Sequence, residues 1–183
     1  MRLTDALSRT LIDLQFLRAC PDDKILHDCR WEAFRASGPG GQKRNKTSSA
    51  IRLTHTPTNV SAIANESRSQ AENRRSALRR LRHRMTLELR AAISVEGFSL
   101  PSWFQLLCPG GRLEVSQRHE LYLPAMGLML DVLAACGWSV SEAAKTLGLS
   151  TSNLVKFLQN DEKLMARVNE MRMIAGLKPL GTG

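Results

Sequence analysis

The stretch Arg35-Ala36-Ser37-Gly38-Pro39-Gly40-Gly41-Gln42 decides how this 183-residue chain is interpreted. Three glycines and one proline sit here inside a basic region that is otherwise rich in strand-forming residues. Glycine permits positive φ and a close backbone approach to a ligand, so Gly40 and Gly41 can turn the chain sharply beside Gln42. Backbone N–H groups presented in this way can bind an anion or a developing oxyanion. A Gly-Gly-Gln tripeptide also occurs by chance. The flanking sequence therefore has to support a functional role for this stretch.

The flanking residues have the patterns of strands and of one long helix. Alternation of apolar and polar residues predicts strands over 29–35, 50–55 and 60–64, the last two joined as a hairpin by the turn residues 56–59. Ser69 with Glu72 fits a capping box that opens a helix. The apolar face of that helix comprises Leu78, Leu81, Met85 and Leu89, and arginines at 74, 75, 79, 80, 82 and 84 cover the rest of its surface.

The positive charge of the chain is confined to this region. Residues 35–90 hold 13 Lys/Arg against 3 Glu, a local charge of +10, while the remaining residues hold 13 against 14, a charge of −1. A basic excess in one segment is the electrostatic footprint of a nucleic-acid partner. A solvated helix face is the alternative explanation.

The sequence outside this region is less basic and predominantly helical. Leucines at positions 3, 7, 11 and 14 predict an amphipathic N-terminal helix. Residues 94–118 are interpreted as a connector with one β-ribbon strand over 112–116, and the chain is helical from His119 onward. The scattered cysteines and histidines predict neither disulfides nor a metal site.

Residues 140–158 resemble a helix-turn-helix. Ala144 permits a close helix crossing, Gly148 makes the turn, and four large side chains fill the angle between the helices: Leu147, Leu149, Leu154 and Phe157. The second helix, 151–159, offers only Lys156 as a cation, with Ser152, Asn153 and Gln159 as candidates for contacts to base edges. A structural three-helix unit that docks on protein or RNA is at least as well supported as a DNA reader.

Three segments together carry a resemblance to a known family. They are residues 35–46 around Gly-Gly-Gln, the strand Ala50-Ile51-Arg52-Leu53-Thr54-His55, and the helix start Arg68-Ser69-Gln70-Ala71-Glu72-Asn73-Arg74-Arg75. In this combination the chain resembles the peptidyl-tRNA hydrolase domain of class I peptide chain release factors. The resemblance implies an α+β fold with a small sheet, a Gly-Gly-Gln loop and a long basic helix, followed here by the all-α helix-turn-helix-like unit. We predict four parts: an N-terminal helix (1–24), the release-factor domain (25–93), the connector (94–118) and the helical domain (119–183).

The resemblance also implies site residues. Gly40 and Gly41 would set the backbone, the main-chain N–H of Gln42 would stabilise the oxyanion or leaving hydroxyl, and the Gln42 side chain would shape a pocket for water. The residues expected to contact RNA are Arg35, Lys43, Arg44, Asn45, Lys46, Arg68, Gln70, Asn73, Arg74 and Arg75. Whether those at the start of the helix touch RNA or only brace the loop is left open. Arg44 departs from the family, because decoding members usually carry a small apolar residue there.

The expected function is codon-independent hydrolysis of peptidyl-tRNA on the ribosome, with large-subunit rRNA and peptidyl-tRNA as partners. The chain has neither the Pro-x-Thr nor the Ser-Pro-Phe tripeptide that decoding release factors use to read stop codons. It ends Gly176-Leu177-Lys178-Pro179-Leu180-Gly181-Thr182-Gly183, without the basic tail common in ribosome-rescue relatives. We expect no metal, no cofactor and no membrane, a cytoplasmic location in preference to an organelle, and a second nucleic-acid or protein partner for residues 119–183. The alternative function is a non-catalytic RNA- or DNA-binding regulator.

Overall fold

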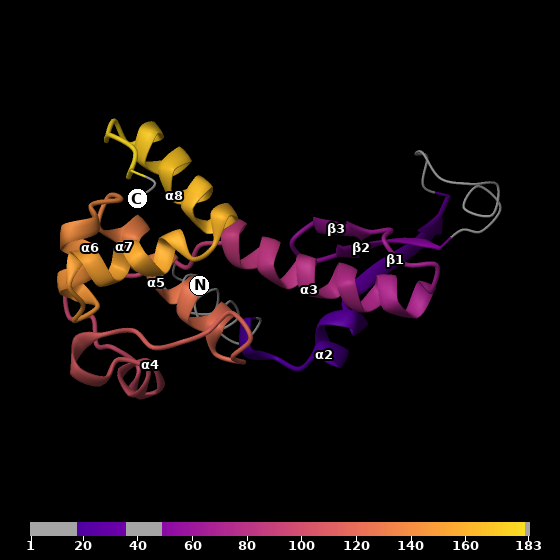
Figure 1. The fold of residues 1–183 in the computed structure, drawn as a ribbon, viewed down its shortest axis with the longest axis horizontal. Coiled ribbons are helices and arrows are strands. Elements are labelled where there is room, and N and C mark those ends of the chain that lie inside the picture. Colours follow the sequence, from indigo (N-terminus) through magenta and orange to yellow (C-terminus); the bar gives the residue numbers. More distant parts are fainter. Residues whose placement is uncertain (1–17, 36–48, 182–183) are drawn as a thin grey trace, which may run out of the picture. The chain divides into compact units, whose positions relative to one another are not determined.

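The computed structural model describes residues 18–35 and 49–181, which fall into two compact units. One unit comprises residues 20–88, and the other comprises residues 89–181 together with Arg18 and Ala19. Their elements are named in Figure 1. A small antiparallel sheet combined with helices confirms the predicted α+β class.

The sheet in the unit of residues 20–88 has the strand order β1-β2-β3. Its strands are β1 (Cys29–Phe34), β2 (Ala50–His55) and β3 (Val60–Ala64), and all neighbours are antiparallel. The three predicted strands are confirmed, with β1 ending one residue earlier than expected. The register pairs Trp31 with Leu53, and Leu53 with Ala62, so these three side chains share one face of the sheet.

The turn between β2 and β3 has the predicted chemistry. Asn59 adopts φ 55, in the left-handed region that Asn tolerates, and its N–H donates to the carbonyl of His55 at 2.8 Å. The side chains of His55 and Thr58 also meet, with Nδ1 and Oγ1 2.8 Å apart. These local bonds fix the hairpin register, because the turn determines which residues of β2 and β3 pair.

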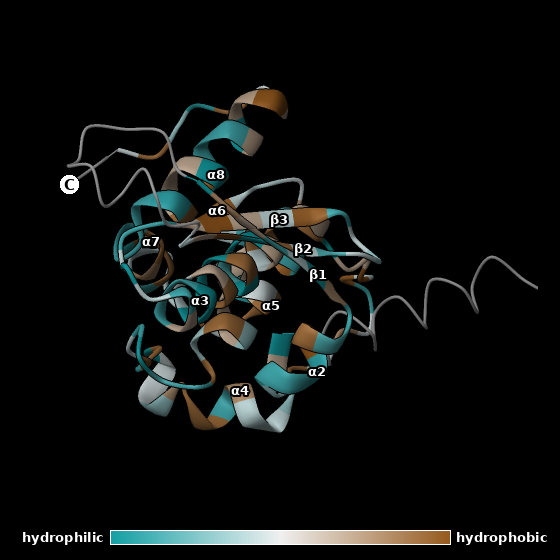
Figure 2. Ribbon diagram, turned by 90° about the vertical axis from the view of Figure 1, so that its right-hand side faces the viewer, coloured by the Kyte–Doolittle hydropathy of each residue, from teal (hydrophilic) through white to brown (hydrophobic). Residues whose placement is uncertain are grey.

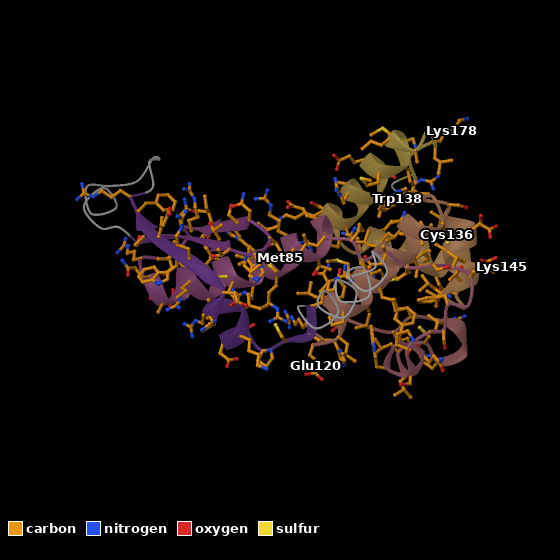
Figure 3. The ribbon with its side chains drawn as sticks, turned by 180° about the vertical axis from the view of Figure 1, so that it is seen from behind. Met85, Glu120, Cys136, Trp138, Lys145 and Lys178 are labelled. Atoms are coloured by element: carbon orange, nitrogen blue, oxygen red, sulfur yellow. The ribbon has the colours of Figure 1, made fainter. Side chains whose placement is uncertain are left out.

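Helix α3 (Gln70–Glu88) lies along the sheet (Figure 1). Its buried face includes Ala77, Leu78, Leu81 and Met85, the last of which is labelled in Figure 3. Leu89 was expected on this face but follows the last helical residue and is only half-buried. The helix therefore covers the side of the sheet that carries Ile51, Leu53 and Ala62.

Half of the predicted capping box is present at the start of α3. The hydroxyl of Ser69 accepts the N–H of Glu72 at 3.3 Å, as expected. The Glu72 carboxylate, however, accepts a hydrogen bond from the Ser67 hydroxyl, and Ser67 Oγ in turn accepts the N–H of Ser69 at 3.0 Å. Ser67 thus takes over the contact that the capping box would have formed directly.

A short helix, α2 (Asp22–His27), precedes β1 and is fastened to α3. The Arg82 guanidinium donates to the carbonyl of Cys20 and to the Asp22 carboxylate, both at 2.8 Å. These contacts attach Cys20 and α2 to the compact unit of residues 20–88.

Helices fill the other unit. They are α4 (Ser102–Leu106), α5 (Tyr122–Ala135), α6 (Val140–Thr146), α7 (Thr151–Gln159) and α8 (Glu162–Ile174). Hydrophobic residues dominate α5, and Figure 2 colours the ribbon by the hydropathy of each residue. Most residues of α5 are buried. The predicted helix-turn-helix is confirmed in its geometry: Gly148 has φ 66, and the four predicted side chains between the helices are all buried.

The turn after α5 contains an unusual backbone. Gly137 adopts φ 59, as its place at a helix end favours, but Trp138 adopts φ 66, which is rare for a bulky residue. The Trp138 side chain is buried and its carbonyl accepts the Arg172 guanidinium of α8 at 2.5 Å. Cys136 and Trp138 are labelled in Figure 3, which shows them beside this turn.

The connector differs from the prediction. Residues 112–116 form neither a helix nor a strand and pair with no strand in the described part of the chain, so the expected β-ribbon strand is wrong. Their backbone bonds are to nearby residues, including one from the Glu114 N–H to the Leu107 carbonyl at 2.8 Å and one from the Arg112 N–H to the Pro109 carbonyl at 3.2 Å. The sequence analysis also missed α4, a helix of five residues that starts after Pro101.

A buried ion-pair cluster, formed by Arg18, Arg90 and Asp131, joins three segments of the helical unit. Asp131 of α5 is 2% exposed and accepts Arg18 at 2.5 and 3.1 Å, Arg90 at 3.3 Å and the N–H of Ala91 at 3.0 Å. Burial lowers the pKa of Arg90 to about 10, against the opposing effect of Asp131. Among the residues that the structure describes, no helix is long and apolar enough to cross a membrane.

Candidate functional site

The structure fixes both flanks of the segment that carries the predicted catalytic residues. Gly40, Gly41 and Gln42 lie outside the described residues, as do Lys43, Arg44, Asn45 and Lys46. On either side, Phe34 at the end of β1 pairs directly with Ala50 at the start of β2. Arg35 and Ser49 are therefore held at the same end of the sheet, which we call the loop end.

Asn73, in the first turns of α3, braces this end. Its side-chain amide donates to the carbonyls of Ser49 at 2.6 Å and of Ser67 at 2.7 Å, and its Oδ1 accepts the N–H of Ser67 at 3.0 Å. The residue is 1% exposed. Of the two roles left open for the start of the helix, these bonds support bracing of the loop flank by Asn73, and its contact with RNA stays a prediction.

The N-terminus of α3 also lies at the loop end. Ala64, the last residue of β3, pairs with Ile51 next to the start of β2, and the chain reaches α3 within a few residues. The first turn of a helix carries a partial positive charge from its unsatisfied N–H groups. This partial charge adds to the arginines of the same region.

Arginines of this unit divide into two groups by their partners. Arg80 and Arg84 donate to the edge-strand carbonyls of Ile63 at 2.7 Å and Ser61 at 2.9 Å, and they pair with Glu66 and Glu88. A second group is exposed and forms no ion pair with a carboxylate in residues 18–35 and 49–181; we call its members the loop-side arginines: Arg68, Arg74, Arg75 and Arg79. Nitrogen-bearing side chains surround α3 and the sheet in Figure 3. Free positive charge is thus concentrated toward the N-terminal half of α3.

The other predicted RNA contacts in the described residues lie on the surface. Arg35 and Gln70 are exposed, the first directly after β1 and the second at the first position of α3. Both belong to the loop end. For Arg35, Arg68, Gln70, Arg74 and Arg75, contact with RNA stays a prediction.

Two aromatic side chains of β1 hold arginines at cation–π distance, and the sequence analysis singled out neither of them. Arg74 lies over the Trp31 ring at 5.6 Å, and Arg52 lies over the Phe34 ring at 5.4 Å. Trp31 and Phe34 point to opposite faces of the strand, since their positions differ by three residues. An aromatic residue on a strand that leads into a basic loop is the signal that could have identified them.

Two ionisable side chains of the sheet lie at the far end from the loop. Cys29 and His55 pair across β1 and β2, about 17 Å along the strands from the pair of Phe34 and Ala50. Burial, with help from Asp28 and against Arg74, raises the pKa of Cys29 to about 11, so its thiol is protonated at neutral pH. Burial also lowers the pKa of His55. Both residues therefore lie at the opposite end of the sheet from Phe34 and Ala50.

Comparisons with known proteins match the two parts of the chain separately. A family model described as RF-1 domain matches residues 25–96. In this region the chain is 51% identical over 65 residues to peptide chain release factor 1 of Acidiphilium cryptum, a match covering 36% of this chain and 18% of the relative. It is 47% identical over 72 residues to peptide chain release factor 1 of Lachnoclostridium phytofermentans, covering 39% and 20%. It is 53% identical over 58 residues to peptide chain release factor 2 of Variovorax paradoxus, covering 32% and 16%.

Residues 25–96 belong to the class I release-factor family. The release-factor domain includes the Gly-Gly-Gln segment, both of its flanks and all of α3. The match spans about a fifth of the length of these relatives. A second family model, described as bacterial regulatory protein of the Fis family, matches residues 126–157, which run from α5 to α7.

Proposed function

We propose that this protein hydrolyses the ester bond of peptidyl-tRNA on the ribosome without reading a codon. The observation that carries the proposal is that the release-factor domain holds both flanks of its Gly-Gly-Gln segment at its electropositive end. Asn73 fixes Ser49, β1 fixes Arg35, and the loop-side arginines supply charge for RNA phosphates.

In the proposed mechanism the backbone N–H of Gln42 donates a hydrogen bond to the developing oxyanion or to the leaving ribose hydroxyl. Gly40 and Gly41 allow the backbone conformation that presents this donor, and the Gln42 side chain shapes the space for the attacking water. The ribosome already holds the ester in place, so a positioned water and a preorganised donor contribute more than a strong base would. This chemistry needs no acid–base pair in the loop, and the sequence of residues 35–46 contains no Asp, Glu or His.

The proposed partners are large-subunit rRNA and peptidyl-tRNA, and the proposed site of action is the ribosome of the cytoplasm. The helical unit would supply localisation, and its own partner differs from the substrate of the loop. We propose codon independence because the 183 residues contain neither the Pro-x-Thr nor the Ser-Pro-Phe tripeptide.

A release assay with full-length protein tests the proposal. Ribosomes carrying labelled peptidyl-tRNA are prepared with a stop codon, a sense codon or no mRNA in the A site, and freed peptide is measured. We expect release in all three cases, and a loss of roughly 10²–10³-fold for Gln42→Pro, which removes the backbone donor. Gln42→Ala keeps that N–H and should lose less.

Controls separate chemistry from binding. Gln42→Pro should still sediment with ribosomes, and Gln105→Ala, a glutamine of the helical unit that bonds the Leu100 carbonyl at 2.9 Å, should release peptide like the wild type. Full activity of Gln42→Pro would refute the proposed role of the loop.

The match to the Fis family gives the regulator hypothesis its support, but contacts of α7 argue against reading of duplex DNA. A recognition helix needs a free polar face to enter the major groove. Asn153 donates to the Gly111 carbonyl at 3.2 Å and Gln159 to the Gly181 carbonyl at 3.1 Å, so two of the base-edge candidates bond within the chain.

Residues 110–115 lie beside α7 and form with it a groove of about 720 Å³ that includes Lys156. Sequence-specific duplex binding that maps to residues 151–159, without hydrolysis on ribosomes, would reverse this preference.

A further inference from the structure

Trp31 occupies an unusual position for a large aromatic residue. It pairs with Leu53, whose side chain is fully buried between the sheet and α3, yet Trp31 itself is 49% exposed. The difference arises because β1 is an edge strand, and α3 packs against β2 and β3. About half of the Trp31 surface therefore faces solvent at the side of the release-factor domain.

Arg74 holds this ring in place. Its guanidinium lies 5.6 Å from the ring centroid, within the range of cation–π attraction. Arg74 is itself a loop-side arginine, so the pair carries a net positive charge. The only acidic residue of β1, Glu32, points to the opposite face of the strand and pairs there with Arg30 at 3.2 Å and Arg52 at 3.6 Å. The Trp31–Arg74 pair thus joins an exposed π surface to a cation.

The surrounding charge favours one class of occupant. A protein partner that covered this site would have to bury Arg74 with Arg75 near it, and no carboxylate in the described residues pairs with either of them. An RNA strand satisfies both parts of the site, because every base has a π face and every linkage has a phosphate. Unpaired nucleotides are the form of RNA in which a base is free to stack on a side chain.

We propose that Trp31 and Arg74 form a stacking site for one unpaired RNA base beside the root of the Gly-Gly-Gln segment. The base lies on the exposed part of the indole ring, and a loop-side arginine contacts the adjoining phosphate. This proposal rests on the proposed function in that the RNA is expected to be ribosomal. It adds a base contact to the phosphate contacts expected of the loop-side arginines.

The test measures binding of full-length protein to a single-stranded oligoadenylate of about 12 nucleotides, and to an abasic ribose-phosphate oligomer of the same length. Trp31→Leu keeps an apolar side chain but removes the aromatic ring, whereas Trp31→Phe keeps a π face. We expect Trp31→Leu to bind oligoadenylate about tenfold more weakly and the abasic oligomer unchanged, with Trp31→Phe close to the wild type. Trp103→Leu, in the helical unit, is the matched control and should bind both oligomers normally.

Tryptophan emission supplies a second readout that a structural role would not change. Stacking of a base quenches the indole, so oligoadenylate should quench the wild type and the Trp103→Leu variant but not Trp31→Leu. Equal affinity of Trp31→Leu and wild type for oligoadenylate would overturn the proposal. An equal loss for both oligomers would also overturn it, since that pattern indicates charge or folding and not stacking. An intact stacking signal in a protein that releases no peptide would leave this proposal standing and refute the proposed function.

Discussion

Arginines differ in burial and in ion pairing between the two units of this protein. In the helical unit the buried Arg18 and the half-buried Arg90 both pair with the buried carboxylate of Asp131, and these ion pairs hold distant segments of the chain together. In the release-factor domain Arg75 and Arg79 are exposed and meet no carboxylate of the described residues. Burial and partners, and not residue type, therefore separate arginines that stabilise the fold from those available to a nucleic acid.

Removal of the shared carboxylate should have the largest effect on stability. Asp131→Ala removes the shared carboxylate from the buried Arg18 and the half-buried Arg90, and we expect the helical unit to lose about 3–5 kcal/mol of unfolding free energy. Urea unfolding monitored by circular dichroism measures this loss. The matched control is Glu66→Gln at the exposed pair with Arg80, which should cost at most about 1 kcal/mol. Equal losses in the two variants would remove the distinction between the units.

The brace at the loop end should have the next largest effect. Asn73→Ala leaves two carbonyls and one N–H without their partner, and we expect a loss of about 2–3 kcal/mol in the release-factor domain. Peptide release should fall further than stability alone explains, because Ser49 is no longer fixed. A variant that unfolds earlier but, when folded, releases peptide at the wild-type rate would show that Asn73 is only structural.

Gly127 offers a test of packing against the buried ion-pair cluster. A Cβ at this position of α5 would lie within 2.5 Å of Cδ and Cζ of Arg18. Ala is the better helix former by about 1 kcal/mol, yet we expect Gly127→Ala to destabilise the unit by about 1–3 kcal/mol through overpacking. Thermal unfolding decides the sign. Stabilisation by Gly127→Ala would mean that the Arg18 side chain moves aside freely.

Acid should weaken the release-factor domain through His55. Burial holds the pKa of His55 below its ordinary value of 6.5, so the unfolded chain binds the proton first as the pH falls. This contribution to stability is complete above pH 6.5 and is lost progressively below it. Urea unfolding at about pH 7.5 and about pH 5.5 measures the decline. His55→Gln should flatten it, whereas His27→Gln, at an exposed site, should not.

The loop-side arginines should show the smallest effect on stability and a clear effect on binding. Arg75→Gln and Arg79→Gln should each change stability by less than about 0.5 kcal/mol. Each should lower the salt dependence of RNA binding by about one counterion, because one phosphate contact is lost. Arg84→Gln, which loses the Ser61 carbonyl and Glu88, should instead affect stability more than the salt dependence.

Local signals predicted much of the fold. The hairpin follows from turn chemistry at residues 56–59, the long helix from its cap and apolar period, and the two helices around Gly148 from one glycine and a set of leucines. The extended segment 112–116 was mispredicted as a strand, because alternation alone does not supply a partner strand. Long-range contacts carried no sequence signal: Arg18 and Asp131 are 113 residues apart.

The sequence predicted which types of residue form the candidate site, but it predicted the roles of individual residues less well. Its basic residues and the Gly-Gly-Gln segment follow from composition and from the family pattern. Asn73, however, is one of several polar residues at a helix start, and its sequence position gives no sign of its role. Only the structure shows that it is buried and that it forms three hydrogen bonds to Ser49 and Ser67. Trp31 was missed because the strand pattern counts it as an apolar position and does not show that it lies at an open edge.

The buried ion-pair cluster has a consequence for the modular history of the chain. Arg18, just before the compact unit of residues 20–88, donates to the carbonyl of Leu89, just after that unit, at 3.0 Å. Asp131 accepts hydrogen bonds from both Arg18 and the N–H of Ala91. The entry and exit points of residues 20–88 thus lie side by side on α5, which is the geometry of a domain inserted into a host. Insertions succeed where the two ends are close, because the host then closes the gap with little distortion. Replacement of residues 20–88 by a short linker should leave a helical domain that folds alone.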